Sequence, residues 1–359
     1  MIDTKKKFTE SLLRWNKQEN SRLMPWKGEK DPYKIWLSEI ILQQTRVEQG
    51  RDYYIRFIAA FDNIGKLANA SETKVFKLWE GLGYYSRCKN LLATAKIIVK
   101  KYDGRFPREF KDILELKGIG PYTAAAIASF AFNKPHAVVD GNVFRVLSRY
   151  FGIYQAVDNT TGKRLFTTLA HELLDKNHPG IYNQALMDFG AVLCKPKQPL
   201  CTTCPLNDRC IAYLSDTVNE LPVKEKSISK KSRWFYYFVV RHNGKTYVRK
   251  RGPKDIWENL YEFILEETPR ATPVDQITAL PSFKKLLGKQ KLKILAVSDN
   301  YRQQLTHQTI NGQFVNAIIK QPFHAEGYSL VDRKQLEKLP FPKLITAYLT
   351  ENGEKAFER

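Results

Sequence analysis

The sequence of 359 residues has comparatively few acidic side chains and no long apolar stretch. Asp and Glu together number 37 against 58 Lys and Arg, which gives a formal net charge of +21. No segment approaches the roughly 18 uninterrupted apolar residues of a membrane span, so we expect no membrane partner. The segment Met1–Lys7 is polar and basic, with no apolar stretch behind it, and we therefore expect a cytoplasmic rather than a secreted protein.

The excess of basic residues favours a polyanionic partner, most simply a nucleic acid. A solvated basic surface is the alternative, because charge alone does not identify a partner. Hydrophobic residues make up 43% of the chain and aromatic residues 12%, enough for buried cores, which excludes a wholly disordered chain. At about 150 residues per domain, the length predicts two or three domains.

Cysteine is scarce but clustered. The pattern is Cys194-x6-Cys201-x2-Cys204-x5-Cys210, and Cys88 stands apart. Disulfides are disfavoured in a reducing cytoplasm, where clustered thiols more often bind a metal. A zinc ribbon would usually contain two Cys-x2-Cys pairs and this segment has one, so a 4Fe-4S cluster is the favoured interpretation over residues 194–210. Zinc and disulfides are the alternatives.

The apolar pattern changes period along the chain. Residues 8–213 show the spacing of helices, whereas aromatic and β-branched residues dominate from Trp234. Asn243-Gly244 lies between two such runs and predicts a β-hairpin, and Asn311-Gly312 predicts a second one. The predicted division is a mainly α region over residues 1–220, a basic linker over 221–233 and an α+β domain over 234–359.

A turn with two glycines precedes an apolar helical stretch. The segment is Leu116-Lys117-Gly118-Ile119-Gly120-Pro121-Tyr122-Thr123, followed by the helical residues 124–132. Glycines allow a tight turn, and the start of the next helix presents free N–H groups to an anion. We therefore predict a helix–hairpin–helix over about 113–130 that holds a DNA phosphate without reading sequence. An ordinary helix end is the alternative.

Two acidic residues are candidates for catalysis. Asp140 ends an apolar approach and begins a helix, whose N–H groups would keep it ionised. Glu39 has apolar neighbours on both sides, so burial would raise its pKa and make it a proton donor near neutral pH. One protonated and one ionised carboxylate is the arrangement that cleaves glycosidic bonds. A helix cap and a surface glutamate are the alternative interpretations.

Taken together and in this order, these segments resemble the DNA glycosylases of the endonuclease-III superfamily, and within it the MutY family of adenine DNA glycosylases. The resemblance covers nearly the whole chain. It implies a mainly α glycosylase region with a helix–hairpin–helix and an iron–sulfur loop, followed by a MutT/Nudix-like α+β domain. The segments that carry it are Pro25-Trp26, Trp36–Glu39, Leu42–Thr45, Trp79–Arg87, Gly120–Thr123, Val139–Val143, Asn183–Gly190 and the loop from Cys194 to Cys210.

The resemblance implies removal of adenine mispaired with 8-oxoguanine or guanine from double-stranded DNA, in base excision repair. Glu39 would protonate the adenine and then act as a base, and Asp140 would stabilise the oxocarbenium-like sugar or attack it. Tyr122 and Asn142 would orient the carboxylates and water. Members that also cut the strand carry a lysine where Tyr122 stands, so the resemblance implies a monofunctional glycosylase.

The resemblance also assigns DNA contacts, and it is consistent with a monomer acting on the nucleoid. Gln44 and Tyr84 would wedge into the duplex. Where the family's recognition loop reads Phe-Ser-His, this chain has Leu305-Thr306-His307, and Thr306 and His307 are expected to discriminate 8-oxoguanine. The glutamate-rich metal box of MutT hydrolases is absent from the sequence, so we expect binding without hydrolysis there. The other expected DNA contacts are Thr45, Arg46, Arg87, Lys117, Gly118 and Gly120.

Two other functions remain as hypotheses. One is an endonuclease III-like glycosylase and lyase acting on damaged pyrimidines, against which Tyr122 and the additional C-terminal domain argue. The other is a non-catalytic iron–sulfur protein that binds DNA. It predicts that Glu39→Gln and Asp140→Asn have no measurable effect.

Overall fold

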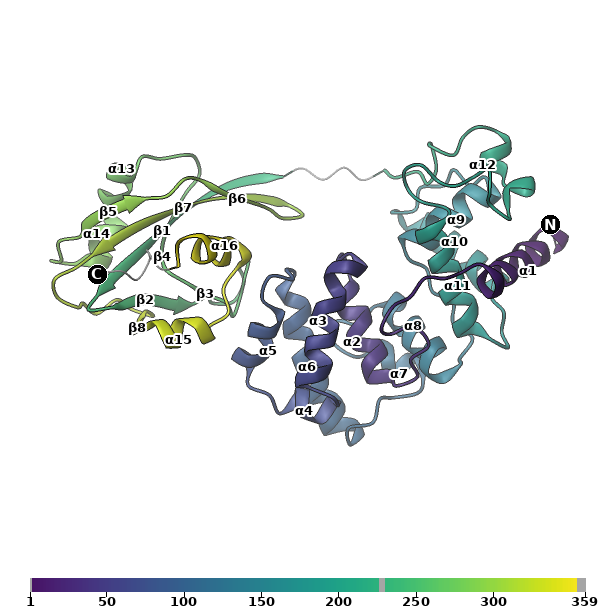
Figure 1. Ribbon diagram of the computed structural model, residues 1–359, viewed down its shortest axis with the longest axis horizontal. Helices are drawn as coiled ribbons and strands as arrows, with labels where there is room; N and C mark the ends of the chain where they lie inside the picture. The colour runs from purple at the N-terminus through teal and green to yellow at the C-terminus, as the bar shows by residue number, and fades with distance from the viewer. Residues whose placement is uncertain (1, 226–229, 354–359) are drawn as a thin grey trace. The chain divides into compact units, whose positions relative to one another are not determined.

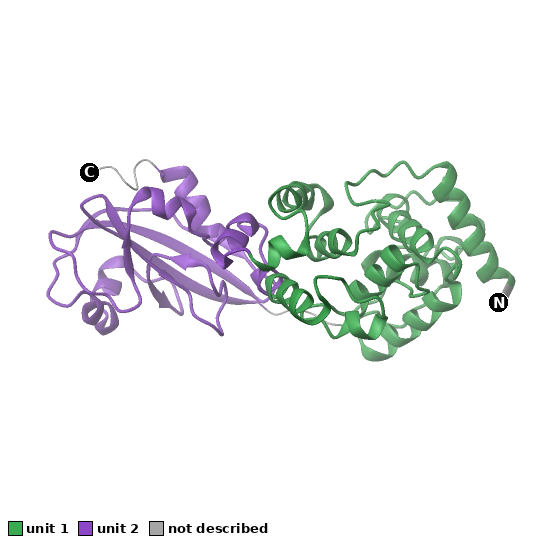
Figure 2. Cartoon of the chain, turned by 90° about the horizontal axis from the view of Figure 1, so that it is seen from below, with its two compact units in different colours: residues 1–69, 90–227 green, residues 70–89, 228–359 purple. Residues whose placement is uncertain are grey.

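The computed structural model describes residues 2–225 and 230–353 and divides into two compact units (Figure 2). Unit 1 comprises residues 1–69 and 90–227, and unit 2 comprises residues 70–89 and 228–359. Part of the predicted linker, residues 226–229, lies outside the described residues. The end of that linker already belongs to a strand, which begins at Lys231.

Unit 1 is built from helices, as the spacing of its apolar residues predicts (Figure 1). Side-chain caps fix several helix starts: Asp31 accepts from the N–H of Tyr33, and Asn159 accepts from the N–H of Gly162. Across residues 2–225 and 230–353, no helix is long and apolar enough to span a membrane. The helices are α1 (Ile2–Gln18), α2 (Pro32–Leu42), α3 (Val47–Ala60), α4 (Ile64–Ala68), most of α6 (Tyr85–Tyr102), α7 (Phe110–Leu114), α8 (Pro121–Phe132), α9 (Gly141–Phe151), α10 (Thr160–Leu173), α11 (Pro179–Val192), a 3-10 turn (Asn207–Arg209) and α12 (Ile211–Leu214).

One apolar core of unit 1 forms among α1, α9, α10 and α11. Phe8 and Phe166 are both fully buried in it. Cys194, Cys204 and Cys210 pack against the same core. Formation of this core therefore also positions the loop that carries the clustered cysteines.

Helices α2 and α8 pack against each other in unit 1. Helix α8 is rich in alanine, and the small buried side chains of Ala124, Ala126 and Ala128 allow neighbouring helices to approach closely. The hydroxyl of Tyr122 on α8 donates a hydrogen bond to Glu39 on α2. The contact between the two helices thus joins two predicted catalytic residues that lie far apart in the sequence.

The predicted helix–hairpin–helix corresponds to α7, a tight turn and α8. In the turn, Gly118 has a φ of +79°, and an added Cβ would lie only 2.7 Å from Cβ of Asn90. Glycine is therefore required at this position. Gly120 is the residue before α8, which begins with Pro121. The first N–H groups of a helix have no partner within it, so this end of α8 suits an anion.

Unit 2 is built on a mixed sheet with strand order β3-β2-β1-β7-β5 (Figure 1). Strand β1 pairs in parallel with β7 along its whole length, from Lys231 opposite Gln308 to Arg241 opposite Ile318. Strands β4, β6 and β8 pair with β1, β7 and β2. The strands are β1 (Lys231–His242), β2 (Lys245–Lys250), β3 (Tyr261–Glu262), β4 (Ile264–Thr268), β5 (Lys293–Val297), β6 (Tyr301–Gln304), β7 (Gln308–Ile318) and β8 (Ser329–Val331). The helices are α5 (Glu72–Trp79), α13 (Val274–Thr278), α14 (Pro281–Leu287), α15 (Arg333–Lys338) and α16 (Lys343–Asn352).

The two Asn-Gly pairs of unit 2 behave differently. The hairpin at Asn243-Gly244 is confirmed, because β1 and β2 pair across it. The hairpin predicted at Asn311-Gly312 is wrong, because both residues lie inside the continuous strand β7. An added Cβ on Gly312 would lie 2.5 Å from Cδ2 of Leu344, so the glycine makes room for a helix packed on the strand.

Residues 70–89 belong to unit 2 because they contact its C-terminal part. The ammonium group of Lys77 on α5 donates to the carbonyl oxygen of Leu339 at 3.0 Å. The N–H of Phe341 donates to the Glu80 carboxylate at 2.7 Å. The segment that contains Tyr84 is therefore attached to the sheet domain by both polar and charged contacts.

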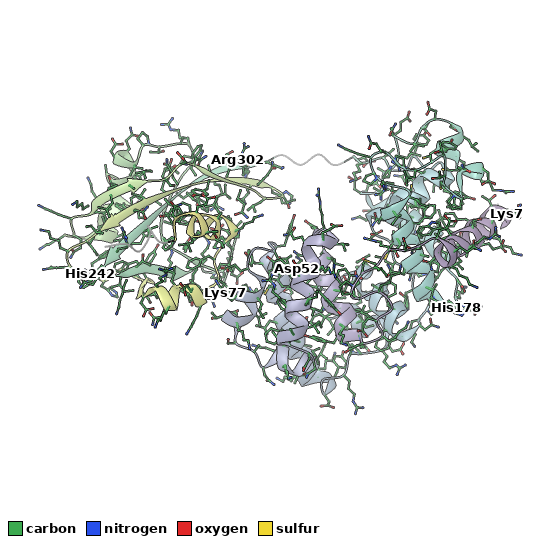
Figure 3. All side chains as sticks on the ribbon, viewed as in Figure 1. Lys7, Asp52, Lys77, His178, His242 and Arg302 are labelled. Carbon is green, nitrogen blue, oxygen red and sulfur yellow. The ribbon has the colours of Figure 1, made fainter. Side chains whose placement is uncertain are left out.

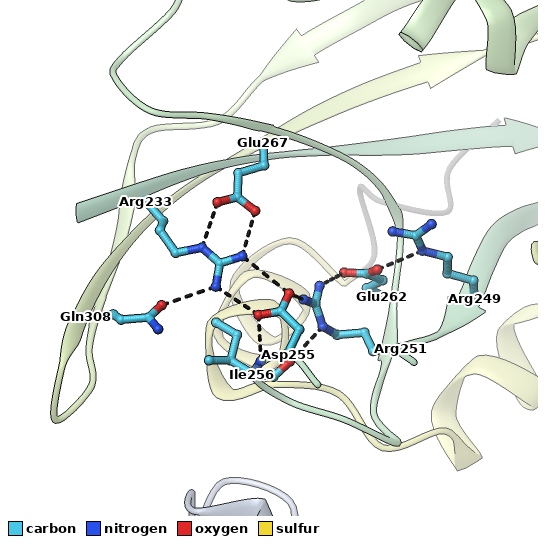
Figure 4. Close-up of polar contacts among 8 residues, drawn as sticks. All are labelled: Arg233, Arg249, Arg251, Asp255, Ile256, Glu262, Glu267 and Gln308. Carbon is cyan, nitrogen blue, oxygen red and sulfur yellow. Dashed lines mark hydrogen bonds and ion pairs between the residues drawn. The ribbon is translucent and has the colours of Figure 1, made fainter. Parts of the chain in front are cut away.

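A network of ion pairs fixes the loop between β2 and β3 in unit 2 (Figure 4). Arg251 pairs with the fully buried Glu262 and with Asp255, and Arg249 donates to Glu262 at 2.8 Å. Arg233 donates to Asp255 at 3.0 Å from the strand β1. Each buried charge thus has an opposite partner, which offsets the cost of removing it from water.

Candidate active site

Glu39 lies on α2 among apolar residues and is 7% exposed, like its buried neighbours Ile40 and Ile41. Burial raises the pKa of Glu39 to about 7. The hydrogen bond from Tyr122 acts in the opposite direction, and the negative charge of Asp140 raises the pKa further. Glu39 can therefore hold a proton at neutral pH, as a general acid must.

Asp140 is the N-cap residue of α9. Its Oδ1 accepts from the N–H of Val143 at 2.8 Å, and its Oδ2 accepts from Nδ2 of Asn142 at 2.8 Å. Burial raises the pKa of Asp140, and these hydrogen bonds and the charge of Arg145 partly oppose that increase. The pKa of both acids is therefore raised, and what distinguishes Asp140 is the set of donors that stabilise its charged form.

A single cavity of about 340 Å³ in unit 1 contains both acids. Tyr122 and Asn142 also line it, so the structure brings the four predicted catalytic residues together. Thr45, predicted from the resemblance as a DNA contact, lies on the wall as well. The volume is at the lower end of the range of about 300–1,000 Å³ that is usual for ligand pockets.

A second polar group borders the cavity and was not predicted from the sequence. Arg22, Lys27 and Gln184 line the wall, and all three bind the carboxylate of Asp188. Asp188 itself is fully buried. The segment Asn183–Gly190 contributes to the family resemblance, but no local pattern indicates which distant cations its aspartate meets.

Arg145 on α9 connects the cavity to the cysteine loop, which the sequence did not predict either. Its Nη2 donates to Oδ1 of Asn142 at 2.8 Å and to the carbonyl oxygen of Gly190 at 2.7 Å. Its Nε donates to the carbonyl oxygen of Cys194 at 2.7 Å. A single buried guanidinium thus fixes both the partner of Asp140 and the start of the cysteine loop.

The four predicted metal ligands line one small cavity beside α9. Burial raises the pKa of the Cys204 thiol to about 12, and the neighbouring thiols of Cys194, Cys201 and Cys210 raise it further. Within the described part of the chain, no three His, Cys, Asp or Glu side chains lie close enough together to hold a single metal ion. The four thiols share one cavity, and thiolates gathered there would need a positive group beside them.

The predicted DNA contacts of unit 1 lie at exposed turns. Gln44 follows α2 with a φ of +55°, and the side chains of Gln44 and Arg46 are both exposed. Lys117, Gly118 and Gly120 are exposed in the turn before α8. Other basic side chains are also accessible in both units, among them Lys7 and Arg302 (Figure 3).

In unit 2 the structure brings Tyr84 and Thr306 together, with 3.1 Å between their hydroxyl oxygens. Tyr84 is 44% exposed and has a φ of +48°. The guanidinium of Arg87 lies 5.2 Å from the Tyr84 ring and 5.3 Å from that of Trp79, and burial lowers the pKa of Arg87 to about 10. Arg87 thus supports Tyr84 from the protein side. His307 is exposed next to Thr306.

Comparison with known proteins agrees with this arrangement. The model of the HhH-GPD superfamily base excision DNA repair proteins matches residues 37–169, and that of the NUDIX domain matches residues 236–351. The adenine DNA glycosylase of Buchnera aphidicola subsp. Baizongia pistaciae is 34% identical over 87% of this chain and 85% of its own length. The chain belongs to the adenine DNA glycosylase family. The adenine DNA glycosylase of Mus musculus is 41% identical over 57% of this chain and 42% of the mouse protein.

Solved structures resemble part of the chain. A thermostable thymine-DNA glycosylase matches with a TM-score of 0.55 and 30% identity, over 59% of this chain and 98% of that chain. A non-covalent endonuclease III–DNA complex matches with a TM-score of 0.51 and 20% identity, over 59% and 97%, which shows a common fold alone. The predicted fold class, the membership of the MutY family and the class of enzyme, a base excision DNA glycosylase, are confirmed.

Proposed function

We propose that this member of the family removes adenine paired with 8-oxoguanine, or with guanine, from double-stranded DNA. The observation that supports this most is the buried Glu39, with a pKa of about 7, in the same cavity as Asp140. A proton donor and a stabilised carboxylate in one pocket suit hydrolysis of a glycosidic bond. Because the reacting atoms of adenine are inaccessible in a stacked duplex, the base must be extruded into the cavity.

In the proposed reaction, Glu39 donates its proton to N7 of the extruded adenine, which then leaves as a neutral base. The bond between the sugar C1′ and N9 of adenine breaks, and positive charge develops on the sugar. Asp140 stabilises that charge as a carboxylate or forms a transient bond to C1′. Glu39, now ionised, takes a proton from the attacking water, and Tyr122 and Asn142 orient the reacting groups.

Tyr122 supports a glycosylase without strand cleavage. It occupies the position where the lyases of the superfamily carry a lysine, and a phenol cannot form a Schiff base with the sugar. We expect the product strand to remain intact at the abasic site, and borohydride to trap no enzyme on the DNA. Efficient trapping would contradict this assignment.

The proposed DNA contacts come from both units. Positive charges and free N–H groups hold the phosphates, whereas Gln44 and Tyr84 enter the duplex. We propose that the protein works as a monomer on the nucleoid DNA of the cytoplasm. The proposed contacts are Gln44, Thr45, Arg46, Lys117, Gly118 and Gly120 in unit 1, and Tyr84 in unit 2. Arg87, also expected to contact DNA, is buried beside Trp79 and supports Tyr84 instead.

We assign recognition of 8-oxoguanine to Thr306 and His307 in the C-terminal sheet domain, whose first strand begins at Lys231. The contact between the hydroxyls of Thr306 and Tyr84 supports this, because it places two polar groups at one exposed point of unit 2. Replacing Thr306 and His307 together by alanine should reduce the preference for adenine opposite 8-oxoguanine over adenine opposite guanine. An unchanged preference in single-turnover assays would contradict the assignment.

A 4Fe-4S cluster is the group that best fits the four thiols at Cys194, Cys201, Cys204 and Cys210. They line one cavity, and four thiolates gathered there need a positive counter-charge. A bound cluster supplies that charge and cross-links the loop. Arg145 and Arg149 then hold the loop through its carbonyl oxygens, including that of Lys195 at 2.7 Å from Arg149.

Three duplexes test the proposed function: adenine opposite 8-oxoguanine, adenine opposite guanine, and thymine glycol opposite adenine. The wild-type protein should excise adenine from the first two and leave the third intact. Glu39→Gln and Asp140→Asn should abolish excision while retaining DNA binding in a mobility-shift assay. Cleavage of the thymine glycol duplex instead would favour the endonuclease III-like alternative, and full activity of both variants would exclude the assigned catalytic residues.

A further inference from the structure

Helix α5 packs against α15 in unit 2, and two side chains at its C-terminal end bind the backbone that follows α15 (Figure 1). Nζ of Lys77 donates to the carbonyl oxygen of Leu339 at 3.0 Å, and Oε1 of Glu80 accepts from the N–H of Phe341 at 2.7 Å. Nζ of Lys77 also lies 2.7 Å from Oε2 of Glu80. The two side chains therefore hold each other and the backbone after α15 at once, through charge-assisted hydrogen bonds.

The turn that follows Glu80 connects this attachment to Tyr84. Gly81 and Gly83 have φ values of +88° and +80°, which allow the chain to turn tightly. Nε1 of Trp79 donates to the carbonyl oxygen of Gly83 at 2.9 Å and closes the turn. Tyr84 is the next residue, so a displacement of Glu80 would also displace Tyr84.

The proposed recognition loop around Thr306 is attached to the same sheet. The N–H of Lys231 in β1 donates to the carbonyl oxygen of His307 at 3.0 Å. The backbone that follows α15 is attached as well, because the N–H of Tyr261 in β3 donates to the carbonyl oxygen of Pro340 at 2.8 Å. Both partners of the tyrosine–threonine hydroxyl contact are therefore attached to one sheet.

We infer that Glu80 is a positioning residue, which together with Lys77 holds Tyr84 beside Thr306 and thereby strengthens discrimination of the base opposite adenine. This inference rests on the proposed function. Hydrogen bonds that distinguish two similar bases require donors and acceptors held to within about 0.5 Å. Glu80 and Lys77 are not among the residues that line the cavity of the catalytic acids, so their loss should affect discrimination more than excision itself.

The test compares single-turnover excision of adenine opposite 8-oxoguanine with excision of adenine opposite guanine. The ratio of the two rates in a variant is divided by the wild-type ratio, so that an equal loss of activity on both duplexes cancels. Glu80→Ala should lower the ratio by about tenfold, the order expected for loss of one hydrogen bond to a charged group. Lys77→Met removes the ammonium group at similar length and should lower the ratio as well.

A double variant separates positioning from an independent effect. Tyr84→Phe already lacks the hydroxyl group that meets Thr306. If Glu80 acts through Tyr84, Glu80→Ala should have a smaller effect on the ratio in this background than in the wild type. An equal effect in both backgrounds, or a wild-type ratio in Glu80→Ala, would overturn the inference.

Tyr247→Phe is the matched control. The hydroxyl of Tyr247, in β2 of the same unit, donates to the carbonyl oxygen of Phe323 at 2.9 Å and accepts from the N–H of Phe323 at 2.8 Å. Its loss removes a comparable attachment of a side chain to backbone, but one that involves neither Tyr84 nor the recognition loop. Tyr247→Phe should therefore destabilise unit 2 and leave the rate ratio unchanged; an equally lowered ratio would indicate a general loss of structure and overturn the inference.

If Glu80→Ala does not fold, as judged by circular dichroism, Lys77→Met decides. A wild-type protein that excises no adenine, or that shows no preference for 8-oxoguanine, would refute the proposed function. A wild type with that preference and variants with unchanged ratios would refute this inference only.

Discussion

The buried Glu39 should make the folded protein less stable as the pH rises, and Glu39→Gln should remove this dependence. The unfolded chain releases the proton of Glu39 near its ordinary pKa of 4.5, whereas burial keeps it bound in the folded protein up to about 7. Between these values unfolding releases a proton, so the free energy of unfolding falls as the pH rises. The two values differ by about 2.5 units at about 1.4 kcal/mol each, which gives a loss of about 3 kcal/mol.

The assay is urea unfolding of the full-length protein at a series of pH values, followed by far-UV circular dichroism. Below pH 4.5 the free energies of unfolding of the wild type and Glu39→Gln should differ by a constant amount. From there to about pH 7 this difference should shift progressively in favour of the variant, and above pH 7 it should again be constant. Ser38→Ala is the matched control, because Ser38 is buried beside Glu39 and does not titrate. A stability difference that is independent of pH would refute the reasoning.

Three further predictions concern separate parts of unit 1. The excision rate should fall above a pH of about 7, because Glu39 is then ionised before it can donate its proton; a rate that keeps rising in a single-turnover pH series would exclude Glu39 as the acid. Gly118→Ala should lower the free energy of unfolding by about 1–3 kcal/mol, because it strains a left-handed backbone and its Cβ presses on Asn90. It should also weaken DNA binding in a mobility-shift assay. A variant as stable as the wild type would show that the turn adapts. Cys204→Ser should lower the bound iron and the stability of unit 1, whereas Cys88→Ser, at a buried thiol outside the loop, should retain the iron.

The features that the sequence predicted are those that depend on neighbours along the chain. The hairpin at Asn243-Gly244 forms because two adjacent strands need a tight turn, and the residues of the turn itself provide it. The same dipeptide at Asn311-Gly312 forms no turn. Its glycine instead makes room for Leu344, which lies far away in the sequence, so no local pattern could indicate this contact. The apolar neighbours of Glu39 likewise predicted its burial.

Groups that assemble from distant segments could not be predicted in this way. Asp188 meets Arg22 and Lys27 from a segment more than 160 residues earlier, and only packing of the helices of unit 1 brings these charges together. The sequence around Asp188 therefore gives no indication of these contacts. Arg145 is similar, because its partners at Cys194 and Gly190 are backbone carbonyl oxygens, whose position no side-chain pattern records.

The pKa shifts of Glu39 and Asp140 depend on their shared cavity as well as on their own motifs. A helix start predicts donors for Asp140, and the structure contains them, but burial in the shared cavity still raises the pKa of this acid. Glu39 has the hydrogen bond from Tyr122 to stabilise its charge, and the charge of Asp140 opposes its ionisation. Asp140 instead receives the N–H of Val143, the amide of Asn142 and the field of Arg145. Burial raises the pKa of both acids, so what distinguishes them is the donors that α9 supplies to the charged form of Asp140.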